Sequence, residues 1–297
     1  MSKRVAVFGG AGQLGAELVQ EFTTRGYTVT GLPRSRVDIT DGAQVEKCLA
    51  ELDPDLVVNA AAYNMVDVAE QEPQAAFLVN ALAVRHLAYA CRQIDARLVH
   101  FSTDYVFDGT ANRPYVEEDP THPLGAYAVS KLAGELYAQG YLERPLIIRT
   151  SGVFGPAGLG TARGNFVELM LRLGASPQPI RVVEDHVASP TYAPALAART
   201  ADLVERGHAG VIHIGGGTPI SWFDYARLIF ELAGLAPELR PTTDREYRTA
   251  ARRPRYSALS NARMESLGLA PMPTLRDAVA AYLAERRRRL QRSGLTA

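Results

Sequence analysis

The stretch RVAVFGGAGQLGAELVQEF, residues 4–22, decides the fold of this chain. It begins with a short apolar run containing β-branched residues, which predicts a strand, and continues with apolar residues at helical spacing. Gly9, Gly12 and Gly15 lie where the two patterns meet, in the arrangement G-x-x-G-x-x-G. Glycine permits a tight turn, and the backbone N–H groups at a helix N-terminus attract anions. This stretch therefore predicts a site for the pyrophosphate of a dinucleotide.

The same alternation of strand and helix continues through the first half of the chain. Continuous apolar strands separated by helices indicate a parallel sheet that is covered on both faces. We therefore expect an α/β fold with a doubly wound parallel sheet of the Rossmann type, formed by residues 1–150. The further strand-like runs are 27–32, 54–62, 96–103 and 145–151, and the helical patterns are 12–25, 41–52, 74–94 and 126–141.

The second half is less regular. Helical patterns cover 165–175, 192–207 and 221–234, with Ser221 as a cap of the last, and 210–216 is typical of a strand. Residues 237–259 are rich in Arg, Pro and Thr and predict loops. We expect residues 151–297 to form a smaller mixed α/β domain that binds the substrate, with some segments returning to the first domain.

Composition excludes several classes of protein. Among 297 residues, Lys and Arg number 32 and Asp and Glu also number 32, whereas a nucleic-acid-binding protein needs clustered cationic surface. No apolar run approaches the ~20 residues of a membrane helix, and the apolar N-terminal stretch is too short for a signal peptide, so a cytoplasmic protein is expected. Cys48 and Cys91 lack metal-ligand spacing, which predicts free thiols and no metal site.

The end of the second predicted strand bears on the choice of cofactor. An acidic residue there would bind the ribose 2′-hydroxyl and favour NAD. Here the sequence has Arg34 and Arg36, and no carboxylate before Asp38. Both arginines could pair with a 2′-phosphate, which predicts NADPH with NADH as a possible substitute, or they could be ordinary surface residues. The small residues after the third strand, such as Ala60, either let the cofactor lie close to the sheet or simply pack in the core.

Tyr127 and Lys131 form the pattern Y-x-x-x-K within a helical segment. A spacing of four puts both side chains on one helix face, where the lysine ammonium would stabilise a tyrosine phenolate and lower the pKa of the phenol. Tyr127 would then be a usable proton donor for a ketone that accepts hydride. The preceding strand ends in Ser102, Thr103 and Asp104, and a hydroxyl at that point can polarise the substrate carbonyl.

These motifs resemble the extended short-chain dehydrogenase/reductases, and among them the dTDP-4-dehydrorhamnose reductase family. The resemblance implies reduction of the C4 keto group of dTDP-4-dehydro-6-deoxy-L-mannose to dTDP-L-rhamnose with NAD(P)H. It spans nearly the whole chain in the right order. The segments that carry it are STDYVFDG (102–109), YAVSKLAGE (127–135), RTSGVFG (149–155), GNFVELML (164–171), VVEDHVASPTYA (182–193), HIGGGTPISWFDYA (213–226) and RPRYSAL (253–259).

Roles for individual residues follow from the resemblance. It implies that Tyr127 is the proton donor, that Lys131 also holds the nicotinamide ribose, and that Thr103 and Asp104 touch the sugar. Gly152 stands where the family usually has an aromatic residue against the sugar. The remaining candidates are Gly12, Gln13 and Leu14 at the pyrophosphate, Asp38 and Ile39 at the adenine, Ala62, Tyr63 and Asn64 along the cofactor, and Asn165, Arg253 and Arg255 toward the sugar or diphosphate.

Two other functions fit the same pattern. A sugar-nucleotide epimerase or dehydratase would retain NAD⁺, but a dehydratase needs an Asp-Glu pair where this chain has Asp104 and Tyr105. A non-catalytic regulatory subunit, like that of methionine adenosyltransferase, would not need Tyr127 and Lys131. His186 replaces a family glutamine and could contact substrate or shape its loop. Many relatives bind Mg²⁺ at a dimer contact, and these residues leave both Mg²⁺ and a homodimer open.

Overall fold

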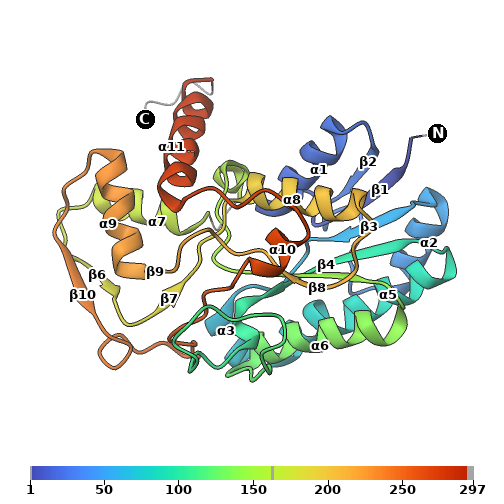
Figure 1. The fold of residues 1–297 in the computed structure, drawn as a ribbon, viewed down its shortest axis with the longest axis horizontal. Helices are drawn as coiled ribbons and strands as arrows, with labels where there is room; N and C mark the ends of the chain where they lie inside the picture. The colour runs from blue at the N-terminus through green and yellow to red at the C-terminus, as the bar shows by residue number, and fades with distance from the viewer. Residues whose placement is uncertain (1, 162–163, 293–297) are drawn as a thin grey trace.

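The computed structural model describes residues 2–161 and 164–292. Its centre is a six-stranded sheet in the order β2-β1-β3-β4-β5-β8, and every neighbouring pair is parallel (Figure 1). The predicted doubly wound parallel sheet is therefore confirmed. The strands are β1 (Arg4–Phe8), β2 (Thr28–Leu32), β3 (Leu56–Asn59), β4 (Arg97–Thr103), β5 (Leu146–Thr150) and β8 (Gly210–His213).

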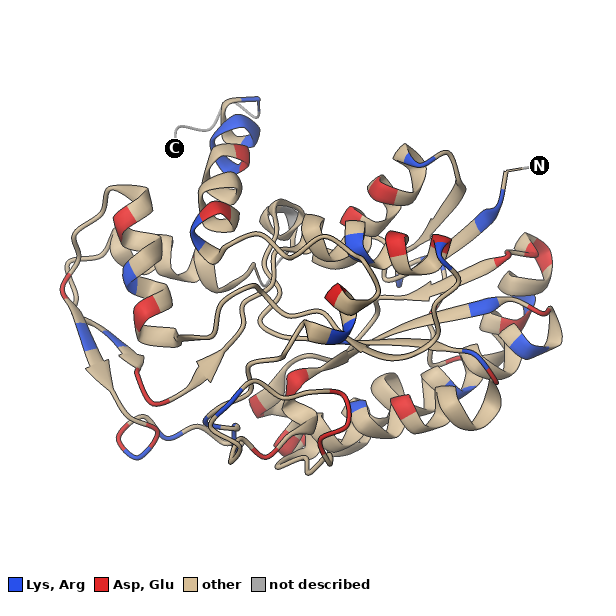
Figure 2. Cartoon of the chain, viewed as in Figure 1, with Lys and Arg blue, Asp and Glu red and all other residues tan. Residues whose placement is uncertain are grey.

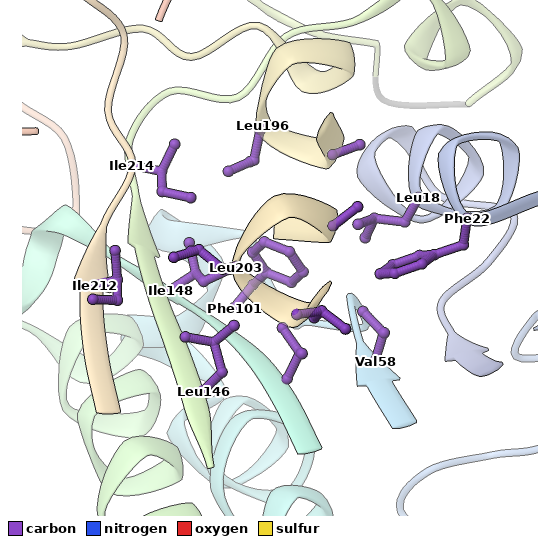
Figure 3. Close-up of a cluster of buried hydrophobic side chains, with 14 of the residues drawn as sticks. Leu18, Phe22, Val58, Phe101, Leu146, Ile148, Leu196, Leu203, Ile212 and Ile214 are labelled. Atoms are coloured by element: carbon purple, nitrogen blue, oxygen red, sulfur yellow. The ribbon is translucent and has the colours of Figure 1, made fainter. Parts of the chain in front are cut away.

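Successive residues of a buried strand point to opposite faces of the sheet. Apolar side chains therefore lie on both faces, and helices cover each of them. In β1, Val5 and Val7 belong to one apolar core, and Ala6 and Phe8 belong to the other. The first core is closed by α1 (Gln13–Thr24) and α8 (Ala193–Glu205), and the second by α2 (Gly42–Leu52), α5 (Ala83–Gln93) and α6 (Ala126–Tyr141). Figure 3 shows the first core, where Leu18, Phe22, Leu196 and Leu203 of the helices meet Val58, Phe101, Leu146, Ile148 and Ile212 of the strands.

The predicted helix 74–94 is interrupted by a wider turn. Helix α4 (Pro73–Phe77) passes into a π-helical turn, η1 (Leu78–Leu82), and then into α5. Helix α6 presses against this turn at Gly134, where a Cβ atom would collide with the carbonyl oxygen of Asn80. A glycine at this point of α6 therefore lets the helix approach η1 closely. Helix α3 (Val66–Gln71) precedes this region.

A second layer lies to the left of the sheet in Figure 1. It has an apolar core of its own, formed by α7 (Phe166–Gly174), α9 (Trp222–Ala233), α11 (Leu275–Arg292) and β6 (Ile180–Val183). Ser221 caps α9 as predicted, because its side chain accepts a hydrogen bond from the backbone N–H of Asp224. Two elements from the second half of the chain belong with the main sheet instead: β8 is its last strand, and α8 packs on one of its faces.

The prediction that residues 237–259 are all loop was wrong. Strand β10 (Leu239–Thr242) pairs in parallel with β6. The pattern concealed it because the strand is short, exposes Arg240 and Pro241, and buries Thr242 in place of an apolar residue. The other short elements are β7 (Val187–Ala188), which pairs with β9 (Ile220–Ser221), the 3-10 turns η2 (Asp104–Val106) and η3 (Pro156–Gly160), and α10 (Ala262–Ser266).

Charged residues of both signs are spread over the helices and loops (Figure 2), in keeping with the balanced composition. Cys48 and Cys91 are both free, as predicted. Across residues 2–161 and 164–292, the structure has no helix with the length and apolar character needed to cross a membrane.

Candidate active site

The glycine turn after β1 is shaped by close contacts between backbone segments. Gly9 has φ +74°, and a Cβ atom there would lie 2.8 Å from the backbone nitrogen of Ala61. Gly12 caps α1 in extended conformation, and its N–H donates to the Gly9 carbonyl at 2.8 Å. Gly15 packs behind the turn, where a Cβ atom would lie 2.7 Å from the Gly9 carbonyl carbon. The turn thus presents bare backbone at the positive end of α1.

A cavity of about 820 Å³ opens beside this turn, at the carboxyl ends of the strands. Strand β2 lies on one side of β1 and β3 lies on the other, so the order of the strands reverses at β1. Open α/β sheets bind ligands at such a switch point. Gly15 does not line the cavity because it packs behind the turn. The predicted cofactor residues that line the cavity are Gly9, Gly12, Gln13, Leu14, Arg34, Asp38, Ile39, Ala60, Ala62, Tyr63, Asn64, Tyr127 and Lys131.

Arg34 and Asp38 mark the end of the cavity beside β2. The Arg34 side chain is 86% exposed and lies 3.4 Å from the Asp38 carboxylate. Asp38 also accepts hydrogen bonds from the backbone and hydroxyl of Thr40, which hold the pKa of its carboxyl below the usual value. Its oxygens are therefore already engaged, whereas the guanidinium extends into solvent. Arg36 is exposed and does not line the cavity.

Thr103, Tyr127 and Lys131 all line the same cavity from β4 and α6. Lys131 is only 3% exposed, and its Nζ donates to the Phe101 carbonyl at 2.6 Å. Burial lowers the pKa of Lys131 to about 8, and the Glu135 carboxylate opposes this shift. The Tyr127 ring meets Tyr105 edge to face, with centroids 6.1 Å apart. The geometry thus puts a phenol, an ammonium and a hydroxyl at the edge of one cavity.

Asp104 lies under this group as a buried carboxyl that also lines the cavity. It accepts hydrogen bonds from Ser257 at 2.5 Å, Ser151 at 2.8 Å and Thr103 at 3.2 Å. Burial raises the pKa of Asp104 to about 6, although these three hydroxyls lower it. Ser257 comes from the C-terminal part of the chain, so Asp104 connects that part to the end of β4. Gly152, which was also predicted as a substrate residue, lines the cavity with φ +48°.

The predicted substrate residues Asn165 and Arg253 do not line the cavity. Asn165 caps α7 and donates to the side-chain oxygen of Gln13 at 2.9 Å, which ties α7 to the glycine turn. Arg253 pairs with Asp67 of α3 at 2.7 Å. Both side chains join separate parts of the chain around the cavity. Arg255 is exposed and also outside the lining.

His186 is 5% exposed, lies 3.7 Å from Asp244 and is absent from the lining, a placement that favours its loop-shaping role. Residues 2–161 and 164–292 contain no group of three or more His, Cys, Asp or Glu side chains that could hold a metal ion. That observation leaves Mg²⁺ at a contact between subunits untested.

Sequence reasoning missed the polar groups that connect the elements around the cavity. Asn80 of η1 accepts a hydrogen bond from the Tyr63 backbone at 2.9 Å and donates to Ser130 at 3.0 Å. It thereby joins the loop after β3 to α6. Glu135 and Arg149 form a buried ion pair at 2.8 Å. The spacing of Glu135 four residues after Lys131 was the one available signal. The lining residues that the sequence analysis did not point to are Ala11, Leu32, Pro33, Val37, Met65, Val79, Phe101, Thr150 and Val153.

Comparison with known proteins identifies the family. The model of the RmlD substrate binding domain matches residues 3–288. A dTDP-4-dehydrorhamnose reductase of Streptomyces griseus is 42% identical over 278 residues, 91% of this chain and 89% of the relative. The spore coat polysaccharide biosynthesis protein SpsK of Bacillus subtilis is 38% identical over 283 residues, 95% of this chain and 98% of the relative.

A solved structure shares the fold over nearly the whole chain. The dTDP-4-dehydrorhamnose reductase of Bacillus anthracis, determined in complex with NADP, superposes with a TM-score of 0.91 and 33% sequence identity. The match covers 96% of this chain and 100% of that structure. Together with the parallel sheet, the glycine turn and the Tyr127–Lys131 pair, these matches show that this chain belongs to the RmlD family, which includes the dTDP-4-dehydrorhamnose reductases.

Proposed function

We propose that this chain reduces the C4 keto group of dTDP-4-dehydro-6-deoxy-L-mannose to give dTDP-L-rhamnose, with NADPH as reductant. The observation that carries the proposal is the single cavity that extends from the glycine turn to Thr103, Tyr127 and Lys131. It offers a dinucleotide site and a proton donor on one surface. The name of the Streptomyces griseus relative and the NADP complex of the Bacillus anthracis relative support the same reaction.

The residues present suit a dinucleotide. Any side chain at Gly9 would collide with the backbone of Ala61, so this part of the cavity is a cradle that stays open only with glycine. The bare N-terminus of α1 suits a pyrophosphate. Arg34 is the exposed cation of the lining beside β2; Thr40 engages one oxygen of Asp38, and the other lies 3.4 Å from Arg34. This arrangement favours a 2′-phosphate and hence NADPH over NADH.

NADPH, when bound, supplies a hydride to C4 of the sugar, and the forming alkoxide then needs a proton. Tyr127 donates its phenolic proton to that oxygen. The Lys131 ammonium stabilises the phenolate left behind, since opposite charges favour the ionised form. The Thr103 hydroxyl, which donates to Asp104 in this structure, can turn its hydrogen toward the carbonyl oxygen and help to polarise it. Lys131 would also hold the nicotinamide ribose.

The direct test follows absorbance of the reduced nicotinamide with purified protein and dTDP-4-dehydro-6-deoxy-L-mannose made in situ. We expect consumption of NADPH in preference to NADH. Tyr127→Phe should keep cofactor binding and lose turnover by on the order of 10²-fold or more. Full activity of Tyr127→Phe would exclude the phenol as the acid. NAD⁺ that stays bound through purification, with no turnover of the ketone, would instead indicate an epimerase or dehydratase.

The remaining alternatives concern assembly. A regulatory subunit would copurify with a partner enzyme and would not consume NADPH with this substrate. The homodimer and the Mg²⁺ that the family resemblance leaves open stay predictions. Sedimentation velocity with Mg²⁺ and with a chelator would decide both, since a metal at the subunit contact would make the mass depend on the cation.

A further inference from the structure

A third ionisable group lies on the catalytic face of α6. Tyr127, Lys131 and Glu135 recur every four residues, and residues at this spacing are neighbours on one side of a helix. Glu135 is 1% exposed, so it is as buried as Lys131 at 3%. A buried carboxylate persists only if neighbouring groups compensate its charge. The reaction as described above uses the first two residues and leaves Glu135 without a role.

Three hydrogen bonds fix the Glu135 carboxylate. Arg149 Nη2 donates to one oxygen at 2.8 Å, and Arg149 Nε donates to the other at 3.0 Å, which is a bidentate pair. The Ser102 hydroxyl donates to the same oxygen as Arg149 Nε. Ser102 directly precedes Thr103 on β4, and Arg149 directly precedes Thr150 on β5. One carboxylate therefore ties α6 to the ends of two strands that line the cavity.

The surroundings of Lys131 make the charge of Glu135 important. His100 of β4 is fully buried, and burial together with Lys131 lowers the pKa of this histidine well below its usual value, so it adds no charge near neutral pH. Glu135 is the carboxylate that favours the ammonium form of Lys131. The other charged or titratable groups on elements packed around α6 near Lys131 are Asp104 and Tyr105 of η2, Arg149 of β5 behind Glu135, and Glu70 of α3, which accepts a hydrogen bond from Ala126 N at the start of α6.

We propose that Glu135 is a positioning residue for the reduction: held by Arg149 and Ser102, its carboxylate on the same face of α6 keeps the buried Lys131 side chain charged. The proposal deepens the proposed function and rests on it. Without the carboxylate, desolvation would favour the neutral amine. A neutral Lys131 would no longer stabilise the tyrosine phenolate, so proton donation would weaken although every group that touches substrate remained.

The experiment uses the small number of lysines in the chain, which are Lys3, Lys47 and Lys131. NMR of protein labelled with ¹³C at the lysine ε-carbon gives the pKa of each ammonium directly. In Glu135→Gln we expect the pKa of Lys131 to fall by on the order of one pH unit, because loss of a nearby opposite charge disfavours the charged form of a buried lysine. The alkaline limb of the kcat/KM profile with NADPH should move down in parallel. An unchanged Lys131 titration in the folded variant would overturn the proposal.

Control variants separate charge from folding. Glu135→Gln leaves Arg149 buried without its partner, so the double variant Glu135→Gln/Arg149→Met, which removes both charges, gives a second test. It should show the same direction of shift for Lys131, and Glu135→Asp should restore the wild-type titration in part. Glu17→Gln replaces another buried glutamate, on α1, and should leave Lys131 unchanged.

The wild type is informative by itself. Lys131 should titrate near pH 8, and a value far below that would mean that the carboxylate does not hold the ammonium charged. This NMR readout needs neither substrate nor cofactor. Absence of ketone reduction by the wild type would therefore refute the proposed function, whereas the titrations decide separately whether Glu135 controls Lys131.

Discussion

Replacement of Gly15 by alanine tests whether the shape of the glycine turn, apart from the groups that line the cavity, controls cofactor binding. Gly15 does not line the cavity, so the new methyl group would not touch the dinucleotide directly. It would lie 2.7 Å from the Gly9 carbonyl carbon and 3.0 Å from the Gly10 Cα. Both neighbours are backbone atoms of a turn, which cannot rotate aside as a flexible side chain would.

The size of the effect follows from this clash. Overpacking costs about 1–3 kcal/mol, and we expect the upper half of that range because the turn or the first residues of α1 must shift. A shift also misaligns the N–H groups that face the pyrophosphate. We therefore expect Gly15→Ala to lower the free energy of unfolding by about 2–3 kcal/mol and to raise the Kd of NADPH about tenfold or more, since each 1.4 kcal/mol of lost binding is tenfold.

Gly140→Ala is the matched control. Gly140 is exposed in α6, and a Cβ atom there meets nothing within 4 Å. Alanine in an open helical position should raise stability by about 0.5–1 kcal/mol and leave NADPH binding unchanged. Urea denaturation and fluorescence titration with NADPH give both quantities for both variants. If Gly15→Ala were as stable as the wild type and bound NADPH equally well, the close-packing explanation would be refuted.

Three further predictions concern the lining. Asp104 has a folded-state pKa of about 6 against 3.8 for the ordinary residue, so its contribution to stability is fully present below pH 3.8 and is lost as pH rises through about 6. In urea denaturation the free energy of unfolding of the wild type, relative to that of Asp104→Asn, should therefore fall by up to about 3 kcal/mol between pH 4 and 7. A difference that stays constant with pH would contradict the raised pKa. Arg34→Ala should weaken NADPH binding about tenfold and leave NADH binding unchanged, as measured by titration with each cofactor. Gly152→Ala adds strain at φ +48° and a methyl group 3.4 Å from the ring of Trp222, the only tryptophan of the chain, so its emission spectrum should shift; an unchanged spectrum would argue against the contact.

Local patterns were sufficient for the first half of the chain. The strands β1, β3, β4 and β5 of the main sheet are buried on both faces and so have continuous apolar runs. Gly9 and Gly15 lie at positions where backbone contacts leave no room for a side chain. The second half gave less information because its short strands have no such run. Strand β10 exposes two of its four residues and contains Pro241, so its pairing with β6 could not be inferred from the residues alone.

Residues of the candidate site could be predicted where they belong to a short sequence pattern. They could not be predicted where two side chains from separate parts of the sequence contact each other. Gly12, Tyr127 and Lys131 belong to short patterns, whereas the partners Glu135 and Arg149 are 14 residues apart and come together only when β5 lies beside β4. Asn165 and Arg253 show the same limit from the other side. Their residue types suit a sugar or diphosphate, but the structure engages them with Gln13 and Asp67.

Hydrogen bonds between distant parts of the sequence explain how side chains at the carboxyl ends of the strands are held in one arrangement. Asp104 depends on Ser257, which lies 153 residues later in the chain, and Gln13 depends on Asn165, which lies 152 residues later. The C-terminal half therefore supports the end of β4 and the glycine turn at the same time, through hydrogen bonds to side chains that line the cavity. It follows that a disturbance of Ser257 or Asn165 should alter substrate and cofactor binding without a change in any residue that donates the proton. Binding measurements on Ser257→Ala and Asn165→Ala, with Tyr127 and Lys131 intact, would separate this support from the chemistry itself.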